Sequence, residues 1–209
     1  MYPTIRHGSP GSEAVAQRAP QRLRALLAVA LFAAAAPAFA ITYTVGNSQD
    51  CTHSTVAAAL TAAENHAGAD SIHITRDGTY AQQAITFTTA QEITLSGGYA
   101  DCTTSTDDGT YTTLNGSGGA HAPVLTINGS TGSLVHLREL SITGGDVANT
   151  GSAGGGIYYT GNGLLDIADS SISNNVGAYG GGINVGGTDD AAELDIGPNT
   201  TIVNNTAYY

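Results

Sequence analysis

The residues in this chain that could do chemistry are mostly acidic. Among 209 residues, 17 are Asp or Glu and six are Lys or Arg, giving a formal net charge of −11 at pH 7. Beyond residue 40 the only cations are Arg76 and Arg138, against sixteen acidic residues. Clustered carboxylates can bind calcium, which prefers oxygen ligands. Asp166 and Asp195, which follow one another in consecutive repeats, are the candidates for a weak calcium site; a solvated acidic stripe is the alternative.

The charge excludes several partners. Without its first forty residues the chain has a formal net charge of −14, which would repel nucleic acid and anionic lipid head groups. An anionic polysaccharide would also be repelled unless cations intervened. We therefore expect no nucleic acid partner.

Neither arginine has the setting of a catalytic base. Arg138 lies in "LVHLREL", where Leu137 and Leu140 are predicted to face inward, so its charge belongs on the outer face beside Glu139. Arg76 lies beside a predicted Asp-Gly turn and is expected in solvent. The acidic pairs 107–108 and 189–190 lie in predicted loops, which does not establish the carboxylate spacing of a glycosidase. We assign no catalytic residue, and no cofactor beyond the calcium considered above.

The two cysteines point to one disulfide. Cys51 and Cys102 are the only cysteines, and the chain contains no C-x-x-C and no histidine spacing typical of zinc sites. In an exported protein two such cysteines are expected to be oxidised. A disulfide between them would close a loop of about fifty residues, and in the chain-entropy account it would add roughly 4 kcal/mol to the free energy of unfolding.

The first forty residues are predicted to be a secretory leader. Arg22 and Arg24 precede an apolar run over 25–36, and Ala38-Phe39-Ala40 supplies a cleavage site after Ala40. A buried N-terminal helix is the alternative. The apolar run is short for a membrane span, and no second one follows, so we expect no transmembrane helix in the mature chain. The Ala-rich leader is typical of bacteria.

One segment of the mature chain has helical periodicity. Apolar residues at Val56, Ala59, Leu60 and Ala63 predict a helix over about 55–66 with one buried stripe. Ser54 is the expected N-cap, and Gly68 lies just past the end. We assign this helix to an N-terminal cap formed by residues 41–80.

Beyond the cap, short strands recur with a fixed period. They are rich in Thr and Ile, alternate apolar and polar residues, and are separated by Gly, Asn, Asp and Ser. Three sets of positions repeat every thirty residues: Ile142, Ile172 and Ile202; Gly144, Asn174 and Asn204; Gly145, Asn175 and Asn205. Such a period is the mark of a solenoid.

About three short strands per repeat, without a helix, predict a right-handed parallel β-helix over 81–209. The three isoleucines would stack inside it, and Asn174 and Asn204 would begin an asparagine ladder between coils. The runs Gly154-Gly155-Gly156 and Gly180-Gly181-Gly182 recur with their neighbours, so they are predicted to be sharp turns. A phosphate-binding loop would need a strand-to-helix setting that this segment lacks.

These repeats resemble right-handed parallel β-helix proteins of the pectin lyase-like superfamily. The stretches "SSISNNVGAYGGGINV" and "NTTIVNNTAYY" look most like the passengers of polymorphic outer membrane proteins and autotransporter adhesins. The stretch "STVAAALTAAENHAGADSIHITRDGTY" is similar to the helical cap that starts many such folds. The resemblance implies that Cys51 and Cys102 join this cap to a coil. The Gly-His-Gly and Arg-Ile-Lys motifs of related polygalacturonases do not occur here.

We therefore expect an all-β, exported, adhesin-like protein without enzymatic activity. Its place would be the cell surface, the outer membrane or the medium of a Gram-negative bacterium, and its partner a glycan or a host or cell-surface protein. The alternatives are a polysaccharide-active lyase or glycoside hydrolase, and a truncated fragment without function. The last coil has no predicted cap, so self-association through an open end is also expected.

Overall fold

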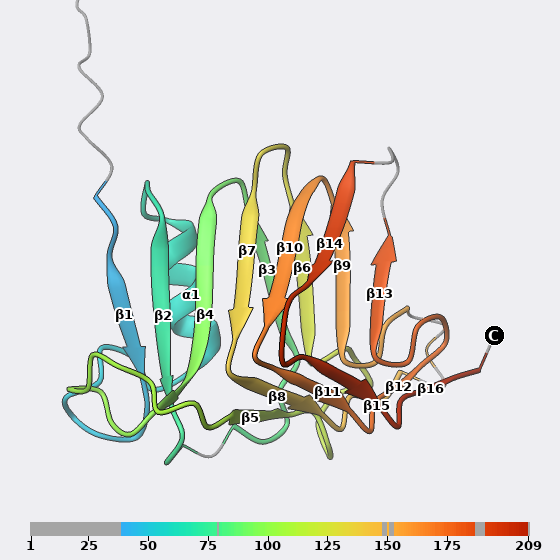
Figure 1. Ribbon diagram of the computed structural model, residues 1–209, viewed down its shortest axis with the longest axis horizontal. Coiled ribbons are helices and arrows are strands. Elements are labelled where there is room, and N and C mark those ends of the chain that lie inside the picture. The colour runs from blue at the N-terminus through green and yellow to red at the C-terminus, as the bar shows by residue number, and fades with distance from the viewer. Residues whose placement is uncertain (1–38, 79, 148–149, 151–152, 187–190, 209) are drawn as a thin grey trace, which may run out of the picture. The chain divides into compact units, whose positions relative to one another are not determined.

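Every strand pairing in the computed structural model is parallel, and the strands wind into a β-solenoid of about five turns. The structure describes residues 39–78, 80–147, 150, 153–186 and 191–208. The predicted mostly-β solenoid with one short helix near its N-terminal part is confirmed (Figure 1). The expected handedness stays a prediction.

The described residues form four parallel sheets along the solenoid. Sheet A contains, in order, β1 (Thr42–Val45), β2 (Asp70–Thr75), β4 (Glu92–Tyr99), β7 (Leu134–Arg138), β10 (Gly163–Ala168) and β14 (Ala192–Ile196). Sheet B contains β3 (Ile85–Thr89), β6 (Leu125–Gly129), β9 (Ile157–Gly161) and β13 (Ile183–Gly186). Sheet C contains β5 (Thr112–Asn115), β8 (Leu140–Thr143), β11 (Ser171–Ser173) and β15 (Thr201–Val203). Sheet D pairs β12 (Val176–Gly177) with β16 (Thr206–Ala207). From β4 on, the chain passes from sheet A to C and then to B, with β12 of sheet D between β11 and β13.

The core is built of aliphatic columns that the register aligns. Ile142 pairs with Ile172, and Ile172 pairs with Ile202, thirty residues further along the chain. Leu114 of β5 begins the same column by pairing with Ile142. The first three side chains are fully buried, whereas Ile202 in the last coil is 45% exposed because no further described coil covers it.

The asparagine ladder lies one residue away from its expected place. Asn175, which is fully buried, accepts from the Gly145 N–H at 2.9 Å and donates to the Ile142 carbonyl at 3.0 Å. Asn205 repeats this bond one coil later, donating to Ile172 O at 2.9 Å and accepting from Asn175 Nδ2 at 3.1 Å.

The expected ladder residues have another role. Asn174 and Asn204 are exposed and take left-handed backbone angles, with φ of 56° and 55°. Gly144 holds the same place one coil earlier, with φ of 72°. These residues turn the chain, because asparagine and glycine tolerate the left-handed region. Their turn directs the next residue inward, which is why Asn175 and Asn205 carry the ladder.

The glycine runs are sharp turns packed coil on coil. Gly154 and Gly180 have φ of 69° and 68°. A Cβ on Gly155 would lie 2.6 Å from Gly181 O, closer than real Cβ contacts, so neither turn has room for a side chain there. The Gly155 N–H donates to Gly181 O at 3.0 Å, which bonds one glycine run to the next.

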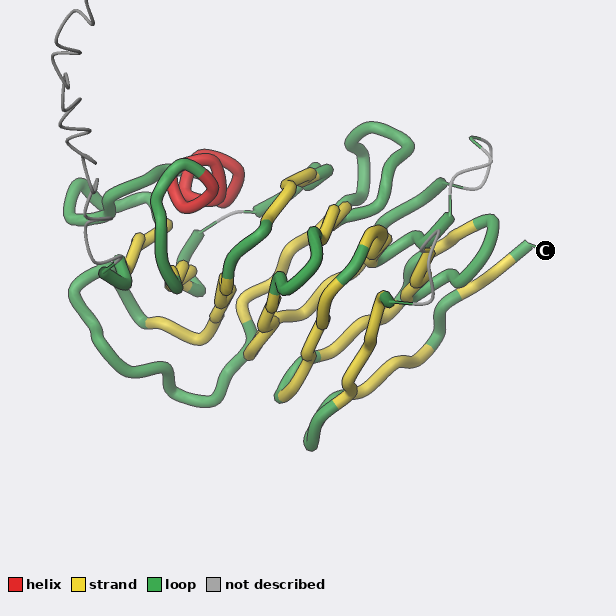
Figure 2. The backbone as a smooth tube through the Cα atoms, turned by 90° about the horizontal axis from the view of Figure 1, so that it is seen from above, coloured by secondary structure: helices red, strands yellow, loops and turns green. Residues whose placement is uncertain are grey.

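The helix α1 (Val56–Glu64) covers the first coils of the solenoid (Figure 2). Its buried residues are Val56, Ala59, Leu60 and Ala63, and it packs mainly against β3. The N-cap is Thr55, not the expected Ser54, because the Thr55 side chain accepts from Ala58 N–H. Glu64 Oε1 accepts from the Thr88 N–H on β3 at 2.6 Å, so the helix also supplies a hydrogen-bond acceptor to a backbone donor of this edge strand.

The predicted disulfide is present. Cys51 and Cys102 are joined with a Cα–Cα distance of 5.1 Å, and this bond links the segment before α1 to the loop that follows β4. Strands β1 and β2 of sheet A already lie within residues 41–80, which the sequence assigned to the cap.

Most of the expected leader lies outside the described residues, so cleavage after Ala40 stays a prediction. In the part of the chain that is described, no helix is long and apolar enough to cross a membrane.

We predict that Asn175→Ala lowers the free energy of unfolding by about 2 kcal/mol, because it leaves a buried N–H and a buried carbonyl without partners. Chemical denaturation followed by circular dichroism measures the change. The matched control is Asn174→Gly, which keeps the left-handed turn and should change stability by about 0.5 kcal/mol or less. Equal losses in the two variants would contradict the ladder.

Candidate functional site: a polar cluster on sheet A

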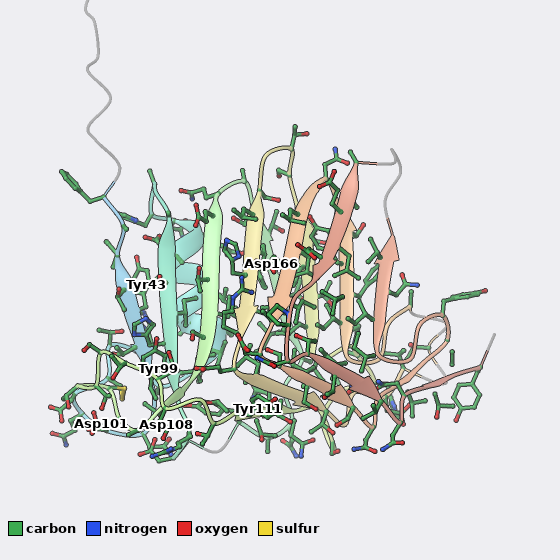
Figure 3. The ribbon with its side chains drawn as sticks, in the orientation of Figure 1. Tyr43, Tyr99, Asp101, Asp108, Tyr111 and Asp166 are labelled. Atoms are coloured by element: carbon green, nitrogen blue, oxygen red, sulfur yellow. A yellow bond between two sulfur atoms is a disulfide. The ribbon has the colours of Figure 1, made fainter. Side chains whose placement is uncertain are left out.

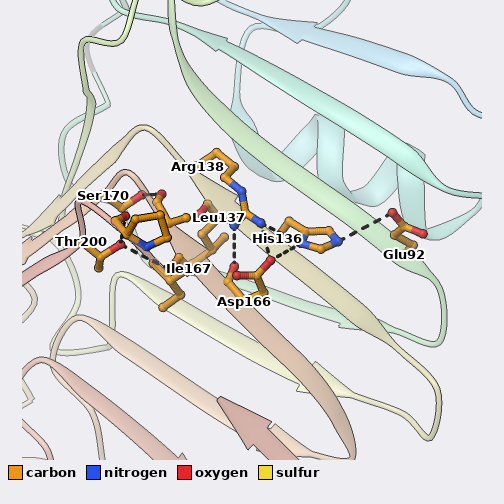
Figure 4. Close-up of polar contacts among 10 residues, drawn as sticks. Glu92, His136, Leu137, Arg138, Asp166, Ile167, Ser170 and Thr200 are labelled. Atoms are coloured by element: carbon orange, nitrogen blue, oxygen red, sulfur yellow. Dashed lines mark hydrogen bonds and ion pairs between the residues drawn. The ribbon is translucent and has the colours of Figure 1, made fainter. Parts of the chain in front are cut away.

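The outer face of sheet A carries four polar side chains from three neighbouring strands. Alternation along β7 buries Val135 and Leu137 completely and leaves His136 and Arg138 half-buried on the outside. The register between β7 and β10 sets Asp166 beside His136. Glu92, at the start of β4, completes this group, which we call the sheet A cluster (Figures 3 and 4).

Asp166 is the centre of the cluster. Its Oδ2 lies 2.7 Å from His136 Nδ1 and accepts a hydrogen bond from Arg138 Nη2 (Figure 4). Arg138 Nη1 also donates to the carbonyl oxygens of Asp166 and Leu137, at 3.0 and 2.9 Å. On the other side of the imidazole, His136 Nε2 lies 3.7 Å from Glu92 Oε1. The guanidinium is thus held by one carboxylate and two carbonyls.

These contacts determine the protonation of Asp166. Burial raises the pKa of its carboxyl, but hydrogen bonds from Arg138 and His136 and the charge of Arg138 outweigh burial, so the pKa falls below its ordinary value. A depressed pKa stabilises the fold above the unfolded-state pKa, and this stabilisation is lost as the pH falls through the folded-state value. The ion pair is therefore fully formed at neutral pH.

A second acidic group lies at the next corner of the coil. Glu139 joins β7 to β8 with φ of 52°, and its Oε2 is buried without a well-aligned hydrogen bond. Burial, the nearby Asp107 carboxyl and the charge of Asp169 raise the pKa of Glu139 to about 7. Burial and the neighbouring carboxyl therefore keep Glu139 protonated up to about neutral pH.

Glu139 belongs to a column of corner residues. Asp169 and Asn199 follow it at intervals of thirty residues, also with left-handed backbone angles, of 49° and 55°. Asn199 Nδ2 donates to Asp169 Oδ1 at 2.8 Å, so two of the three bond directly from coil to coil. The thirty-residue period could have identified this column, which sequence reasoning missed.

A stacked pair of rings lies near Glu139 and Asp107, which we call the acidic corner. His73 of β2 stacks on Tyr99 of β4 with ring centroids 4.0 Å apart and planes 11° from parallel. Burial lowers the pKa of His73, and the Asp107 carboxylate partly offsets this. His73 itself lies half-buried against Tyr99.

The two calcium candidates lie next to each other, but Asp166 already forms an ion pair with Arg138. Asp166 and Asp195 pair in register across β10 and β14. The cation beside Asp166 is Arg138, and nowhere in the described ranges do three His, Cys, Asp or Glu residues come together as a group that could hold a metal ion. The expected outward position of Arg138 fits its place on the outer face of sheet A.

The remaining candidates lie apart from this cluster. Arg76 pairs with Asp108, so the expected acidic pair 107–108 divides between two partners. The pair 189–190 lies outside the described residues.

Among the tyrosines near the glycine turns, Tyr159 is fully buried, while Tyr179 and Tyr208 are more than half exposed. A cavity of about 350 Å³ lies at the turns from sheet B to sheet A, lined by other residues, among them Ser133, Asn162 and Glu193.

Comparison with known proteins gives no relative: no family model, no curated protein and no solved structure matches this chain.

We predict that Arg138→Ala lowers the free energy of unfolding by about 1–2 kcal/mol at pH 7, because it leaves the half-buried Asp166 carboxylate without its cation. Denaturant titration measures this loss, which should shrink towards pH 3 as Asp166 becomes protonated. Arg76→Ala removes the other Arg–Asp pair, which is more exposed, and should cost less than about 1 kcal/mol. If both arginines cost the same, the special role of the Asp166 pair is wrong.

At Glu139 we predict that stability changes with pH in the direction opposite to that at Asp166. The raised pKa of Glu139 means that the folded protein binds more protons than the unfolded chain between about pH 4.5 and 7, so stability falls as the pH rises through this window. Glu139→Gln should remove that fall and stabilise the protein by about 1–2 kcal/mol at pH 8, with little effect at pH 4.5. Thermal melts across this range measure it, with the exposed Glu193→Gln as control. An unchanged pH profile in Glu139→Gln would contradict the raised pKa of Glu139.

Proposed function

We propose that this chain is an exported, non-enzymatic β-solenoid of the bacterial cell surface, similar to the passengers of polymorphic outer membrane proteins and autotransporter adhesins in the pectin lyase-like group. Its place would be the surface, outer membrane or surroundings of a Gram-negative bacterium. The leader-like first forty residues, the disulfide and the Asn- and Gly-rich coils support this proposal. Its ligand would be a glycan or a host or cell-surface protein.

The state of Arg138 is the observation that carries the non-enzymatic reading. Three of the five N–H donors of its guanidinium are bonded to Asp166 Oδ2 and to two backbone carbonyls, which holds the group in place as the partner of Asp166. What the sheet A cluster offers instead is a rigid set of polar groups on an open face. Fixed polar groups of this kind suit recognition of a partner, because little side-chain entropy is lost on binding.

The partner would lie across the outer face of sheet A, centred on His136. A neutral glycan fits best, because the acidic chain repels polyanions and the cluster presents both donors and acceptors to hydroxyl groups. The partly exposed ring of His73, which stacks on the buried Tyr99, adds one aromatic ring to the same sheet.

Glycan binding by the purified chain tests this proposal. We expect retention of at least one neutral glycan on an array, and about tenfold weaker binding in His136→Gln, which disturbs the cluster centre. His121→Gln, an exposed histidine on another loop, is the control and should bind as the parent does. Absence of binding to glycans and to extracellular matrix proteins alike would remove support for the role.

The acidic corner favours one alternative, a polysaccharide-active enzyme. A carboxyl with a pKa of about 7 beside a second carboxyl is the pattern of a general acid. Turnover of a polysaccharide that is lost in Glu139→Gln and kept in Glu193→Gln would favour this function over adhesion.

A further inference from the structure

Two neighbouring turns from sheet B to sheet A differ in length, and a cavity lies beside them. Four residues, 130–133, separate β6 from β7, whereas only Asn162 separates β9 from β10 (Figure 1). The Ser133 N–H closes the longer turn by donating to Ser130 O at 2.9 Å, and Gly132 takes a φ of 84° within it. Because turns of unequal length stack here, they leave a cavity of about 350 Å³.

Hydrogen bonds between the two turns hold the walls of this cavity in place. Ser133 is only 2% exposed, and its Oγ donates to Asn162 O at 3.1 Å. The Asn162 N–H donates to Gly129 O at 2.9 Å, and the Leu164 N–H donates to Ser133 O at 3.0 Å. The strands that follow, β7 and β10, each have a neighbouring strand on both sides. The cavity is therefore preformed, so a ligand would have to order little of the protein.

The cavity lining combines two leucines with an amide and a hydroxyl group. Leu134 and Leu164 are in-register neighbours on the outer face of sheet A, and both are half-buried. Thr131 and Asn162 also line the cavity, and Asn162 Nδ2 donates to Thr131 Oγ1 at 3.4 Å. Within the described ranges no residue donates to Asn162 Oδ1, so this oxygen can accept from a ligand N–H.

The cavity is continuous with the sheet A cluster. Leu134 and Leu164 lie two residues before His136 and Asp166 on the same strands, and alternate residues of a strand face the same side. Two residues of strand span about 7 Å. One oligosaccharide can therefore occupy the cavity and also reach the polar groups of the cluster.

We propose that this cavity is a subsite for an N-acetylhexosamine unit of the glycan. The acetamido methyl group packs on the two leucines, its N–H donates to Asn162 Oδ1, and the Thr131 hydroxyl donates to its carbonyl oxygen. The volume is at the small end for ligand sites, which suits one sugar unit. This inference rests on the proposed glycan-binding function and names the sugar that the same face selects.

The acetamido group is favoured because it carries a methyl group and an amide together. A hydroxyl group at the same carbon of the sugar would offer the leucines no apolar partner. Glu92 pairs with Leu134, and the exposed Glu193 pairs with Leu164, across sheet A. These carboxylates flank the leucine pair and repel sugars that carry a negative charge, such as uronates and sialic acids. A neutral acetamido sugar therefore fits both the lining and the charge.

Calorimetric titration of the purified full chain with matched sugars tests this inference. Chitotriose and cellotriose share one backbone and differ by an acetamido or a hydroxyl group at the same carbon of each unit. Methyl N-acetylgalactosaminide and methyl galactoside form a second pair. We expect the acetamido member of at least one pair to bind about tenfold more tightly. Its addition should also shift the methyl resonances of Leu134 and Leu164.

Leu164→Ser and, separately, Asn162→Ala should each abolish this preference and leave binding of the hydroxyl sugar unchanged. Leu164 is half-buried on an outer face and Asn162 lies in a turn, so each variant should keep its fold, which circular dichroism checks. Val203→Ser is the matched control, since Val203 is an aliphatic residue of sheet C that is 49% exposed. It should keep the preference.

The subsite is wrong if the members of each pair bind alike, if the preference survives both cavity substitutions, or if neither acetamido sugar binds at millimolar concentration. His136→Gln lies outside the cavity and should weaken both members of a pair by the same factor. Equal binding within the pairs, with loss in His136→Gln, would therefore reject the subsite and leave the glycan-binding role of the sheet A cluster standing. The glycan array decides that role separately.

Discussion

In-register stacking of parallel coils is the constraint on which this structure depends. Each strand bonds to the equivalent strand of the next coil, and neighbouring strands lie about 4.8 Å apart. Whatever occupies a position is therefore in contact with its equivalent in the next coil, which lies thirty residues along the chain for β8, β11 and β15. Isoleucine at such a position gives a dry column, and asparagine gives a ladder whose amides bond coil to coil. The backbone of each coil is stable only because its neighbours satisfy it.

The same constraint creates the polar features of the surface. Stacking sets Asp166 beside His136 and within reach of Arg138, which favours the charged carboxylate. At the corner it buries Glu139 and aligns it with Asp169, and burial, more than the charge of Asp169, favours the neutral acid. The register thus lowers the pKa of Asp166, whereas the raised pKa of Glu139 comes mainly from burial and from Asp107.

Much of this was open to prediction from the period alone. The thirty-residue spacing gave the aliphatic column and the helix stripe gave the cap, because both depend only on which residues recur. The pairing of His136 with Asp166 obeys the same spacing and could have been predicted. Periodicity could not choose between Asn174 and Asn175, because both recur; the left-handed turn at Asn174 decides which side chain enters the coil. The approach of Asp107 to Glu139 comes from an irregular loop and leaves no pattern in the sequence.

The thirty-residue register itself is tested most directly by methyl–methyl nuclear Overhauser effects in isoleucine-labelled protein. The stacked coils predict contacts from Ile142 to Ile172 and from Ile172 to Ile202, and none from Ile142 to Ile202, which lie two coils apart at about 10 Å. Absence of the two nearest-neighbour contacts, or contacts of Ile172 with residues offset from this register, would contradict the solenoid as described.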